Sequence, residues 1–350
     1  FSEDQLLFQD SVRGFLVNEI TPERLRAGWD TDTGRDPALW QQLAEMGLTG
    51  LTVPEEHGGL GMDAVDFVLL AQECGYVALP EPLVNHALVA VPLLQDLGGE
   101  LAAHWLPLAA SGEARVIVAL EQNLLAEDAH VADLLLLERG GEWFALTQGQ
   151  FSCEHSESVD PGRRLFTVTV QAGATPVATG AAAAALRAAS LNRGALGCAA
   201  QALGLAQRMI DLSVQYTAER KQFGKPIGSF QAVKHHMANV AVRLEYAKAP
   251  VHRAAFEVAE NAAGASLAVA QAKLMACEAA NLAAKNSIQV HGAMGYTWEV
   301  DLHIFMKKPG PLRIPGAMRV GTNSRWPRPY LQMARPSVPA PRSSEPDKET

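Results

Sequence analysis

The sequence is poor in cysteine: its 350 residues include four, Cys74, Cys153, Cys198 and Cys277. They lie far apart in the chain and form no Cys-x-x-Cys pair, which excludes a disulfide-stapled fold and a zinc ribbon. A chain of this length buries enough apolar surface to hold a core without such cross-links. We therefore expect reduced core thiols in a cytoplasmic protein, and a catalytic thiol is the less favoured alternative.

The sequence also lacks a surplus of basic residues and a long apolar run. Its 29 Lys and Arg against 38 Asp and Glu give a net charge of −9, which excludes a general nucleic-acid binder. No stretch of about 18 apolar residues is free of charge, so we expect no transmembrane helix. The acidic start, Phe1 to Asp4, is not typical of a signal peptide.

The familiar motifs of metal and nucleophile catalysis are missing as well. There is no His-Glu-x-x-His, Gly-x-Ser-x-Gly or P-loop lysine motif. His235 and His236 are neighbours on a predicted helix, where adjacent side chains point about 100° apart and cannot share a metal ion. Glu55 and Glu56 stand in a glycine-rich loop, where a loop role is favoured over a pair of converging acids. We therefore predict no metal site.

The residues that are present divide the chain into four parts. Apolar residues at helical spacing predict short helices over residues 1–114. Short β-rich runs predict a small β region over residues 115–178, and these runs are Val116–Leu120, Ala132–Leu137, Trp143–Leu146 and Leu165–Val170. Three long helical segments with polar breaks predict a bundle over residues 179–308. Residues 309–350 are rich in Pro, Ser and Arg, which predicts disorder.

Two segments of the helical second half combine glycines with charged or polar residues. The first is Glu219–Gly224 (Glu-Arg-Lys-Gln-Phe-Gly), in which an arginine at a turn can hold a phosphate with its forked donors. The second is Gln289–Thr297 (Gln-Val-His-Gly-Ala-Met-Gly-Tyr-Thr), in which small residues allow the backbone to approach a ligand closely. Taken alone, the first is more typical of a charged turn between helices, and the second of a helix C-cap.

Together, and in this order on a chain of helices, strands and helices, these segments resemble the acyl-CoA dehydrogenase family. The loop Pro54–Gly61 is similar to that family's Pro-Glu-x-x-Gly-Gly-x-Gly, and Glu219–Gly224 to its Glu-Arg-x-x-Phe-Gly. Gln289–Tyr296 is similar to its Gln-x-x-Gly-Gly-x-Gly-[Phe/Tyr], with Ala293 in place of one glycine. The resemblance covers residues 1–308. It implies a mostly α fold with a small β insertion: an N-terminal helical domain, a middle β domain and a C-terminal four-helix bundle.

The resemblance also implies a reaction and a cofactor. Members of the family bind FAD between two protomers and dehydrogenate an acyl-CoA thioester. A glutamate removes the proton next to the carbonyl, the flavin takes a hydride from the following carbon, and an electron-transferring flavoprotein is the usual electron acceptor. By the matching positions, the residues expected to contact the FAD of the neighbouring protomer, or to flank its diphosphate and adenosine, are Arg220, Gln222 and Phe223, and Gln289, Gly292 and Ala293.

The resemblance fails where the family holds a protomer's own flavin ring and removes the proton. The Thr-Glu-Pro-x-Ala-Gly-Ser-Asp run of the middle domain is absent, and Ala119–Asp128 stands in its place. The two positions at which the family carries its glutamate base fall near Gly316 and Gly194, and a glycine side chain cannot accept a proton. We therefore expect no catalytic residue on this chain.

This asymmetry favours a subunit of a larger enzyme. Segments that reach into a neighbour's FAD site are kept, whereas those that serve the chain's own site are not. The chain resembles the short, base-lacking subunit of heteromeric steroid side-chain acyl-CoA dehydrogenases, which contain two copies of each subunit. We predict that it supplies Arg220 and the Gln289 segment in trans to a catalytic partner. A non-catalytic scaffold subunit, a base-independent flavoenzyme and a homo-oligomer are the alternatives.

The match ends abruptly after Lys308. Relatives of this type often continue with Trp-Gly-Asp-Ala-x-x-His, and reading Ile314–Asn323 in a shifted frame can restore such a run. We interpret residues 309–350 as the product of a frameshift in the encoding DNA, with a divergent tail as the alternative. Resequencing the gene across this junction decides between them.

Overall fold

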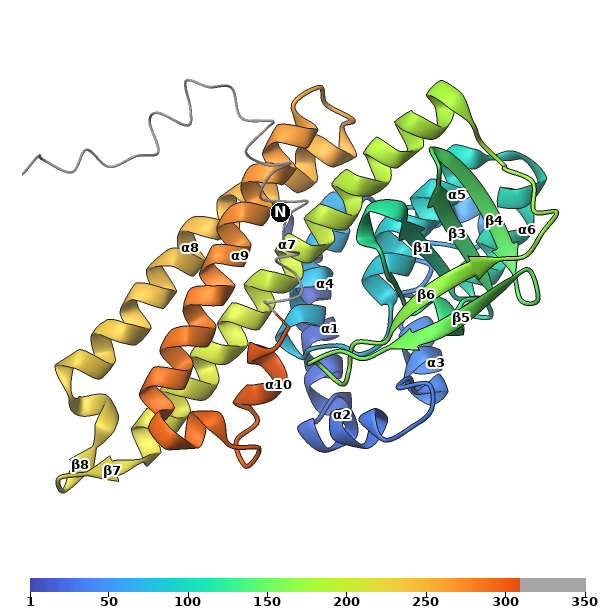
Figure 1. Cartoon of the computed structure of the whole chain (residues 1–350). Coiled ribbons are helices and arrows are strands. Elements are labelled where there is room, and N and C mark those ends of the chain that lie inside the picture. Colours follow the sequence, from blue (N-terminus) through green and yellow to red (C-terminus); the bar gives the residue numbers. More distant parts are fainter. Residues whose placement is uncertain (309–350) are drawn as a thin grey trace, which may run out of the picture. The chain divides into compact units, whose positions relative to one another are not determined.

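The computed structural model describes residues 1–308. The predictions made for the other residues, which are the disorder and the frameshift of residues 309–350 and the base position at Gly316, lie outside the described residues. Within the described part, no helix is both long and apolar enough to cross a membrane. The chain runs from short helices through two small sheets to a group of long helices (Figure 1), which confirms the predicted fold class.

The short helices of the first third begin at strong capping residues. Ser2 and Gln5 cap each other: the Gln5 N–H donates to Ser2 Oγ at 3.2 Å, and the Ser2 N–H donates to the Gln5 side chain at 2.8 Å. Asp36 caps the third helix, and Pro37 occupies its first turn. The helices are α1 (Glu3–Glu19), α2 (Pro22–Trp29), α3 (Pro37–Glu45), α4 (Ala64–Tyr76), α5 (Val91–Leu97) and α6 (Gly99–Ala110).

The β region forms two three-stranded sheets. Its strands are β1 (Val116–Leu120), β2 (Ala126–Glu127), β3 (Leu134–Arg139), β4 (Glu142–Thr147), β5 (Phe151–Ser156) and β6 (Leu165–Val170). One sheet has the order β1-β3-β4, with β1 and β3 parallel; the other has the order β2-β6-β5 and is antiparallel. Apolar side chains of both sheets, among them Ile117, Leu135 and Phe166, pack into one shared core.

Three long helices, α7 (Gly180–Glu219), α8 (Gln231–Ala259) and α9 (Ala265–His291), lie side by side and are followed by the short α10 (Leu302–Met306) (Figure 1). Because successive long helices reverse direction, α7 and α9 are parallel, and their C-terminal ends lie together. Helix α4 crosses α7 so closely that only glycine fits. A Cβ atom at Gly204 would lie 1.9 Å from the carbonyl oxygen of Gln72. The N-terminal helices and the long helices therefore share one core.

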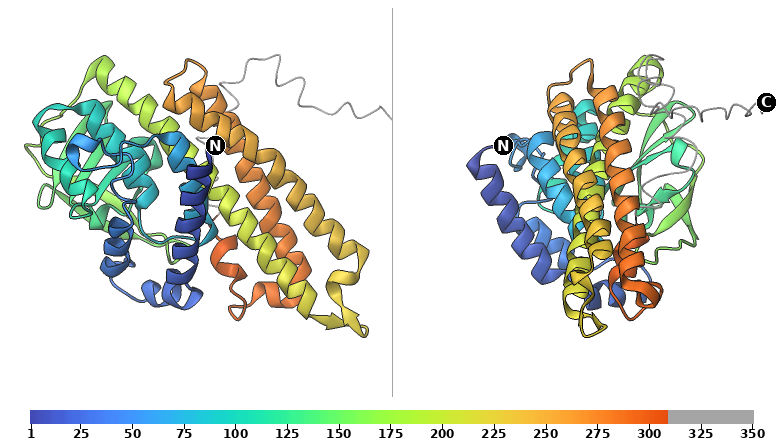
Figure 2. Two further views of the ribbon diagram at one scale, coloured as in Figure 1. Left: turned by 180° about the vertical axis from the view of Figure 1, so that it is seen from behind. Right: turned by 90° about the vertical axis from the view of Figure 1, so that its left-hand side faces the viewer.

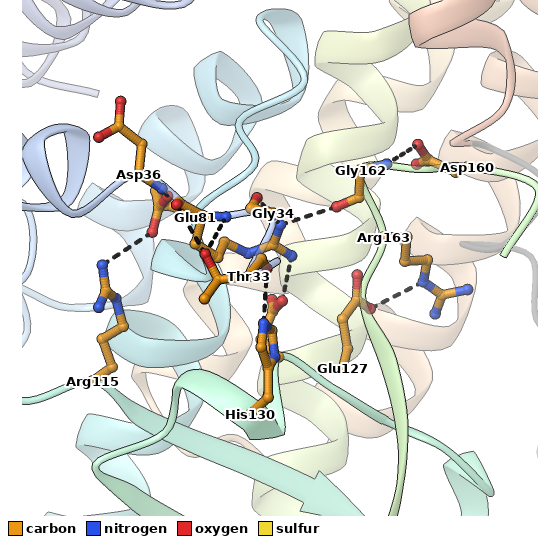
Figure 3. A network of polar contacts seen from close by, with 12 residues as sticks. Thr33, Gly34, Asp36, Glu81, Arg115, Glu127, His130, Asp160, Gly162 and Arg163 are labelled. Atoms are coloured by element: carbon orange, nitrogen blue, oxygen red, sulfur yellow. Dashed lines mark hydrogen bonds and ion pairs between the residues drawn. The ribbon is translucent and has the colours of Figure 1, made fainter. Parts of the chain in front are cut away.

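A buried ion pair fastens the β region to the N-terminal helices, within the network of polar contacts that Figure 3 shows around Gly34 and Gly162. The Arg35 guanidinium contacts the Asp128 carboxylate and donates to the carbonyl oxygens of Gly34 at 2.7 Å and Gly162 at 3.1 Å. Burial raises the pKa of Asp128 to about 7, and the charge of Arg35 opposes this rise. The loss of either partner would leave an uncompensated charge in the interior and would destabilise this contact. Arg35 and Asp128 together therefore hold the β region against the N-terminal helices.

Candidate functional site

The first segment singled out in the sequence forms a hairpin at the end of α7. Arg220 leaves the helix with φ −68° and ψ 122°, and β7 (Lys221–Gln222) then pairs with β8 (Lys225–Pro226). Phe223 and Gly224 join the two strands with φ values of 53° and 79°, as a two-residue type I′ turn requires. This conformation is strained for a phenylalanine. The Phe223 side chain is nevertheless 92% exposed, so the chain's own core does not account for its presence.

The second segment forms the end of α9. The helix stops at Gly292, whose φ of 61° and ψ of −136° suit glycine alone, and a short 3₁₀ turn over Gly292–Tyr296 follows. A Cβ atom on Gly292 would meet no atom within 4 Å, so the space beside this backbone is open. Gly295 differs, because a Cβ atom there would lie 3.0 Å from the Ile288 carbonyl oxygen. Gly295 packs against its own helix. The expectation that Gly295 gives a ligand access to the backbone is therefore wrong.

An aromatic stack joins the two segments. Tyr216, in the last turn of α7, stacks on His291 at the end of α9 with ring centroids 4.2 Å apart, and its hydroxyl donates to the His291 carbonyl oxygen at 3.4 Å. The His291 Nδ1–H donates to the carbonyl oxygen of Ser287 at 2.7 Å. Burial lowers the pKa of His291, which favours the uncharged ring. The stack brings the two segments together at one end of the long helices (Figure 1).

We call the exposed surface formed by the hairpin and the end of α9 the bundle-end surface. Arg220, Lys221 and Lys225 take part in none of the ion pairs formed within residues 1–308, so no carboxylate of the described chain neutralises them. Lys225 lies over the Phe230 ring, with its Nζ 4.4 Å from the ring centroid. Cations without a carboxylate partner, an exposed aromatic ring and an open backbone thus share one surface. All six residues that the sequence predicts at a cofactor are exposed there: Arg220, Gln222, Phe223, Gln289, Gly292 and Ala293.

The base position that lies within the described residues is in the middle of α7. Gly194 is half-buried there, and a Cβ atom on it would lie 4.0 Å from Val89 Cγ2. The residues one helical turn away, Ser190 and Cys198, are not carboxylates. This part of α7 therefore presents no general base of the expected kind.

The segment that replaces the family's flavin-ring motif is used in internal contacts. Residues 121–123 form a 3₁₀ turn after β1. The Glu121 N–H donates to the Glu138 carboxylate at 3.1 Å, and Glu138 also pairs with Arg187 of α7 at 3.3 Å. These groups tie β1, β3 and α7 together.

Comparison with known proteins gives the same assignment for both helical parts. Residues 2–113 match the acyl-CoA dehydrogenase N-terminal domain, and residues 183–316 match the acyl-CoA dehydrogenase C-terminal domain. The chain is 32% identical over 309 residues to the acyl-CoA dehydrogenase IpdE2 of Mycolicibacterium smegmatis. That similarity covers 88% of this chain and 92% of the relative.

Solved structures share the fold. The ChsE4–ChsE5 complex from Mycobacterium tuberculosis gives a TM-score of 0.81 at 22% identity, covering 96% of this chain and 99% of that one. A variant of the Tcur3481–Tcur3483 steroid ACAD gives a TM-score of 0.78 at 23% identity, covering 92% of this chain and 99% of that one. With both helical domains matched and a relative that is similar over nearly its whole length, the chain belongs to the acyl-CoA dehydrogenase family.

Proposed function

We propose that this chain is a subunit of an enzyme that dehydrogenates an acyl-CoA thioester, and that it contributes contacts to FAD at its interface with a catalytic partner. One observation carries the proposal. The six expected cofactor residues are exposed on one surface, whereas the one of the two base positions that lies within the described residues is a glycine, Gly194. These two features together fit a subunit that supplies FAD contacts to a shared site, while its partner supplies the base.

The residues of the bundle-end surface fit FAD. Arg220 has the forked donors that match a diphosphate, and Lys221 and Lys225 add positive charge. Gly292 leaves the backbone open to close approach. The exposed ring of Phe223 provides an apolar contact that the assembled site would bury. When bound, FAD supplies the acceptor for the hydride, and these residues hold the cofactor without a metal ion.

The partner supplies the base in this proposal. A carboxylate must take the proton next to the thioester carbonyl, and Gly194 has none to offer. The ChsE4–ChsE5 structure is named as a complex, and the Tcur3481–Tcur3483 protein is named as a steroid enzyme. From these names we infer an assembly of two kinds of subunit and a bulky polycyclic acyl group as the substrate. A further structure of the same fold is named as an electron-transferring flavoprotein, and with the usual acceptor of the family this leads us to infer an electron-transferring flavoprotein as the electron acceptor.

A non-catalytic scaffold subunit with the same fold is the second candidate. The glycine at the base position favours it, because a scaffold needs no base. The two candidates differ in the role of Arg220, which contacts FAD in the first and has no ligand in the second.

Arg220→Gln, measured in the complex with the catalytic partner, separates the two candidates. Losing a charge-assisted hydrogen bond to the diphosphate costs about 1.5–3 kcal/mol, so the Kd for FAD should rise at least about tenfold. Arg243→Gln changes an exposed arginine on α8 and is the control, which should leave the Kd unchanged. An intact complex in which Arg220→Gln binds FAD as tightly as the wild type would support the scaffold.

A further inference from the structure

Strand β5 lies at the edge of its sheet and has one free side. The strand order is β2-β6-β5, so β5 pairs with β6 on one side and with no described strand on the other. Figure 1 shows β5 as the outermost strand of this sheet. In the right-hand view of Figure 2, the green strands of residues 151–170 lie at the outer side of the molecule, and no described helix is drawn beyond them. An open edge of this kind is able to pair with a strand of another chain.

The hydrogen-bond pattern of the sheet indicates which backbone groups of β5 are free. Opposite residues in an antiparallel pair alternate between pairs that exchange backbone hydrogen bonds and pairs that do not. The Gln171 N–H donates to the Gln150 carbonyl oxygen at 2.9 Å, and the alternation from this pair places Glu154 in a hydrogen-bonded pair with β6. Cys153 and His155 therefore direct their N–H and C=O groups toward the free edge, where no backbone group within residues 1–308 pairs with them.

The edge lacks the features that usually prevent pairing with another strand. Natural sheets protect their edges with proline, lysine or a β-bulge. Strand β5 (Phe-Ser-Cys-Glu-His-Ser) contains neither proline nor lysine, and its register with β6 is continuous from Phe151 to Ser156. Its six residues are a usual length for a strand. The free side of β5 is therefore a complete template for one more strand.

The two faces of β5 indicate which side chains a further strand would carry. On the inner face, Phe151 and Cys153 pack against the shared core of the two sheets but remain only half-buried. Apolar side chains beside them would complete the cover of this core. On the outer face, Glu154 is exposed and takes part in none of the ion pairs within residues 1–308. A basic side chain directly opposite would pair with it.

We propose that β5 binds an extended segment of another protein as an additional antiparallel strand, with apolar residues toward the core of the β region and a basic residue opposite Glu154. The backbone of the segment exchanges hydrogen bonds with Cys153 and His155, and its alternating side chains provide the specificity. Strand β5 contains none of the six expected cofactor residues. The proposal therefore does not depend on the proposed function.

The charge pattern favours a different protein over a second copy of this chain. Strand β5 contains no lysine or arginine. If β5 paired with β5 of a second copy, Glu154 would therefore have no cation opposite it. A segment with a basic residue at that position supplies the complementary charge.

A synthetic strand tests the backbone pairing on the full chain. The probe is acetyl-Thr-Lys-Val-Lys-Val-Lys-Thr-amide, whose central lysine lies opposite Glu154 and whose valines lie opposite Cys153 and His155. Calorimetric titration at low salt should give a Kd below about 1 mM. N-methylation of both valines removes the N–H groups that face β5 and should raise the Kd at least about tenfold. N-methylation of the central lysine, whose N–H faces away, is the matched control and should change the Kd less than about threefold.

A proline on the free edge tests the same pairing from the side of this chain. His155→Pro removes an N–H that faces the edge and no hydrogen bond to β6. It should raise the Kd of the probe at least about fivefold relative to His155→Ala, which keeps the N–H. Thermal unfolding of both variants monitors the fold, and the comparison of the two N-methylated probes does not depend on either variant.

Charge reversal tests the position of the basic residue. Glu154→Lys should raise the Kd of the lysine probe at least about threefold at low salt. The same variant should bind a probe with glutamates in place of the lysines more tightly than the wild type does. Phe223→Ser on the bundle-end surface is the control and should leave both Kd values unchanged.

Three results would each overturn the proposal. The first is a wild-type chain that shows no binding of the lysine probe up to about 1 mM. The second is an equal Kd for the two N-methylated probes. The third is a wild-type chain that forms a dimer which His155→Pro disrupts, because this would assign the edge to a second copy.

Discussion

At the scale of single residues, His86 shows how burial sets the pH dependence of stability. Its Nδ1 accepts the Val116 N–H at 3.0 Å, and its Nε2–H donates to the Ala109 carbonyl oxygen at 3.3 Å, so the neutral ring fits this position. Burial lowers the pKa of His86 from 6.5 to about 4. Because the folded-state pKa lies below the unfolded-state value, the stabilisation is complete above about pH 6.5 and is lost as the pH falls toward 4.

His86→Asn removes this titration. The variant should be less stable than the wild type at about pH 7.5, because a buried hydrogen-bonding group loses its partner. At about pH 5 the wild type has lost about 2 kcal/mol of the stabilisation that comes from His86, so the difference in unfolding free energy should shrink by that amount. Denaturant titrations at both pH values measure it. An equal difference at the two pH values would contradict the assigned role.

Phe223 is the residue at which local strain and the proposed function are most clearly linked. Its backbone has a φ of 53°, and its ring is exposed. Phe223→Gly should leave the free energy of unfolding unchanged or raise it by up to about 1 kcal/mol, because glycine adopts this conformation without strain. In the complex with the partner, the same change should weaken FAD retention. A loss of more than about 1 kcal/mol of stability would instead show that the ring supports this chain's own fold.

At the scale of elements, the crossing of α4 and α7 depends on a missing side chain. A Cβ atom at Gly204 would lie 1.9 Å from the backbone oxygen of Gln72. Gly204→Ala should therefore destabilise the protein by about 1–3 kcal/mol. Gly14→Ala is the matched control in α1, where a Cβ atom meets no atom within 4 Å, and it should stabilise by about 0.5–1 kcal/mol. Thermal unfolding of both variants measures this contrast, and two shifts of the same sign would contradict it.

The elements that local patterns determine could be predicted, and those that depend on distant contacts could not. Apolar spacing predicts the long helices, and alternating or continuous apolar runs predict β1, β3, β4 and β6. Strand β5 was missed because Phe151–Ser156 is mostly polar and half-exposed, and its strand conformation comes from pairing with β6. The pairing of Arg35 with Asp128 was missed because no local signal joins residues that far apart.

At the scale of the whole molecule, the candidate site exists because α7 and α9 end together. The sequence selects the candidate site residues through the resemblance of two short segments to family motifs. It does not identify Tyr216, whose stack on His291 joins positions 75 residues apart and fixes both segments on one surface. A motif search selects residues that would contact a ligand. Tyr216 would not contact the ligand; it positions the backbone at the end of α9 through its contacts with His291. The bundle-end surface carries the candidate cofactor residues, whereas the base position at Gly194 carries no carboxylate. We interpret this combination as that of a subunit in a larger assembly.

The central claim is that this chain completes the FAD site of a catalytic partner and lacks a complete site of its own. The flavin absorbance band tests it most directly, measured on the chain purified alone and on the complex obtained by co-expression with a catalytic acyl-CoA dehydrogenase subunit. We predict no flavin band for the chain alone and a clear band for the complex. A near-stoichiometric flavin band in the chain alone, with turnover of an acyl-CoA, would contradict the claim.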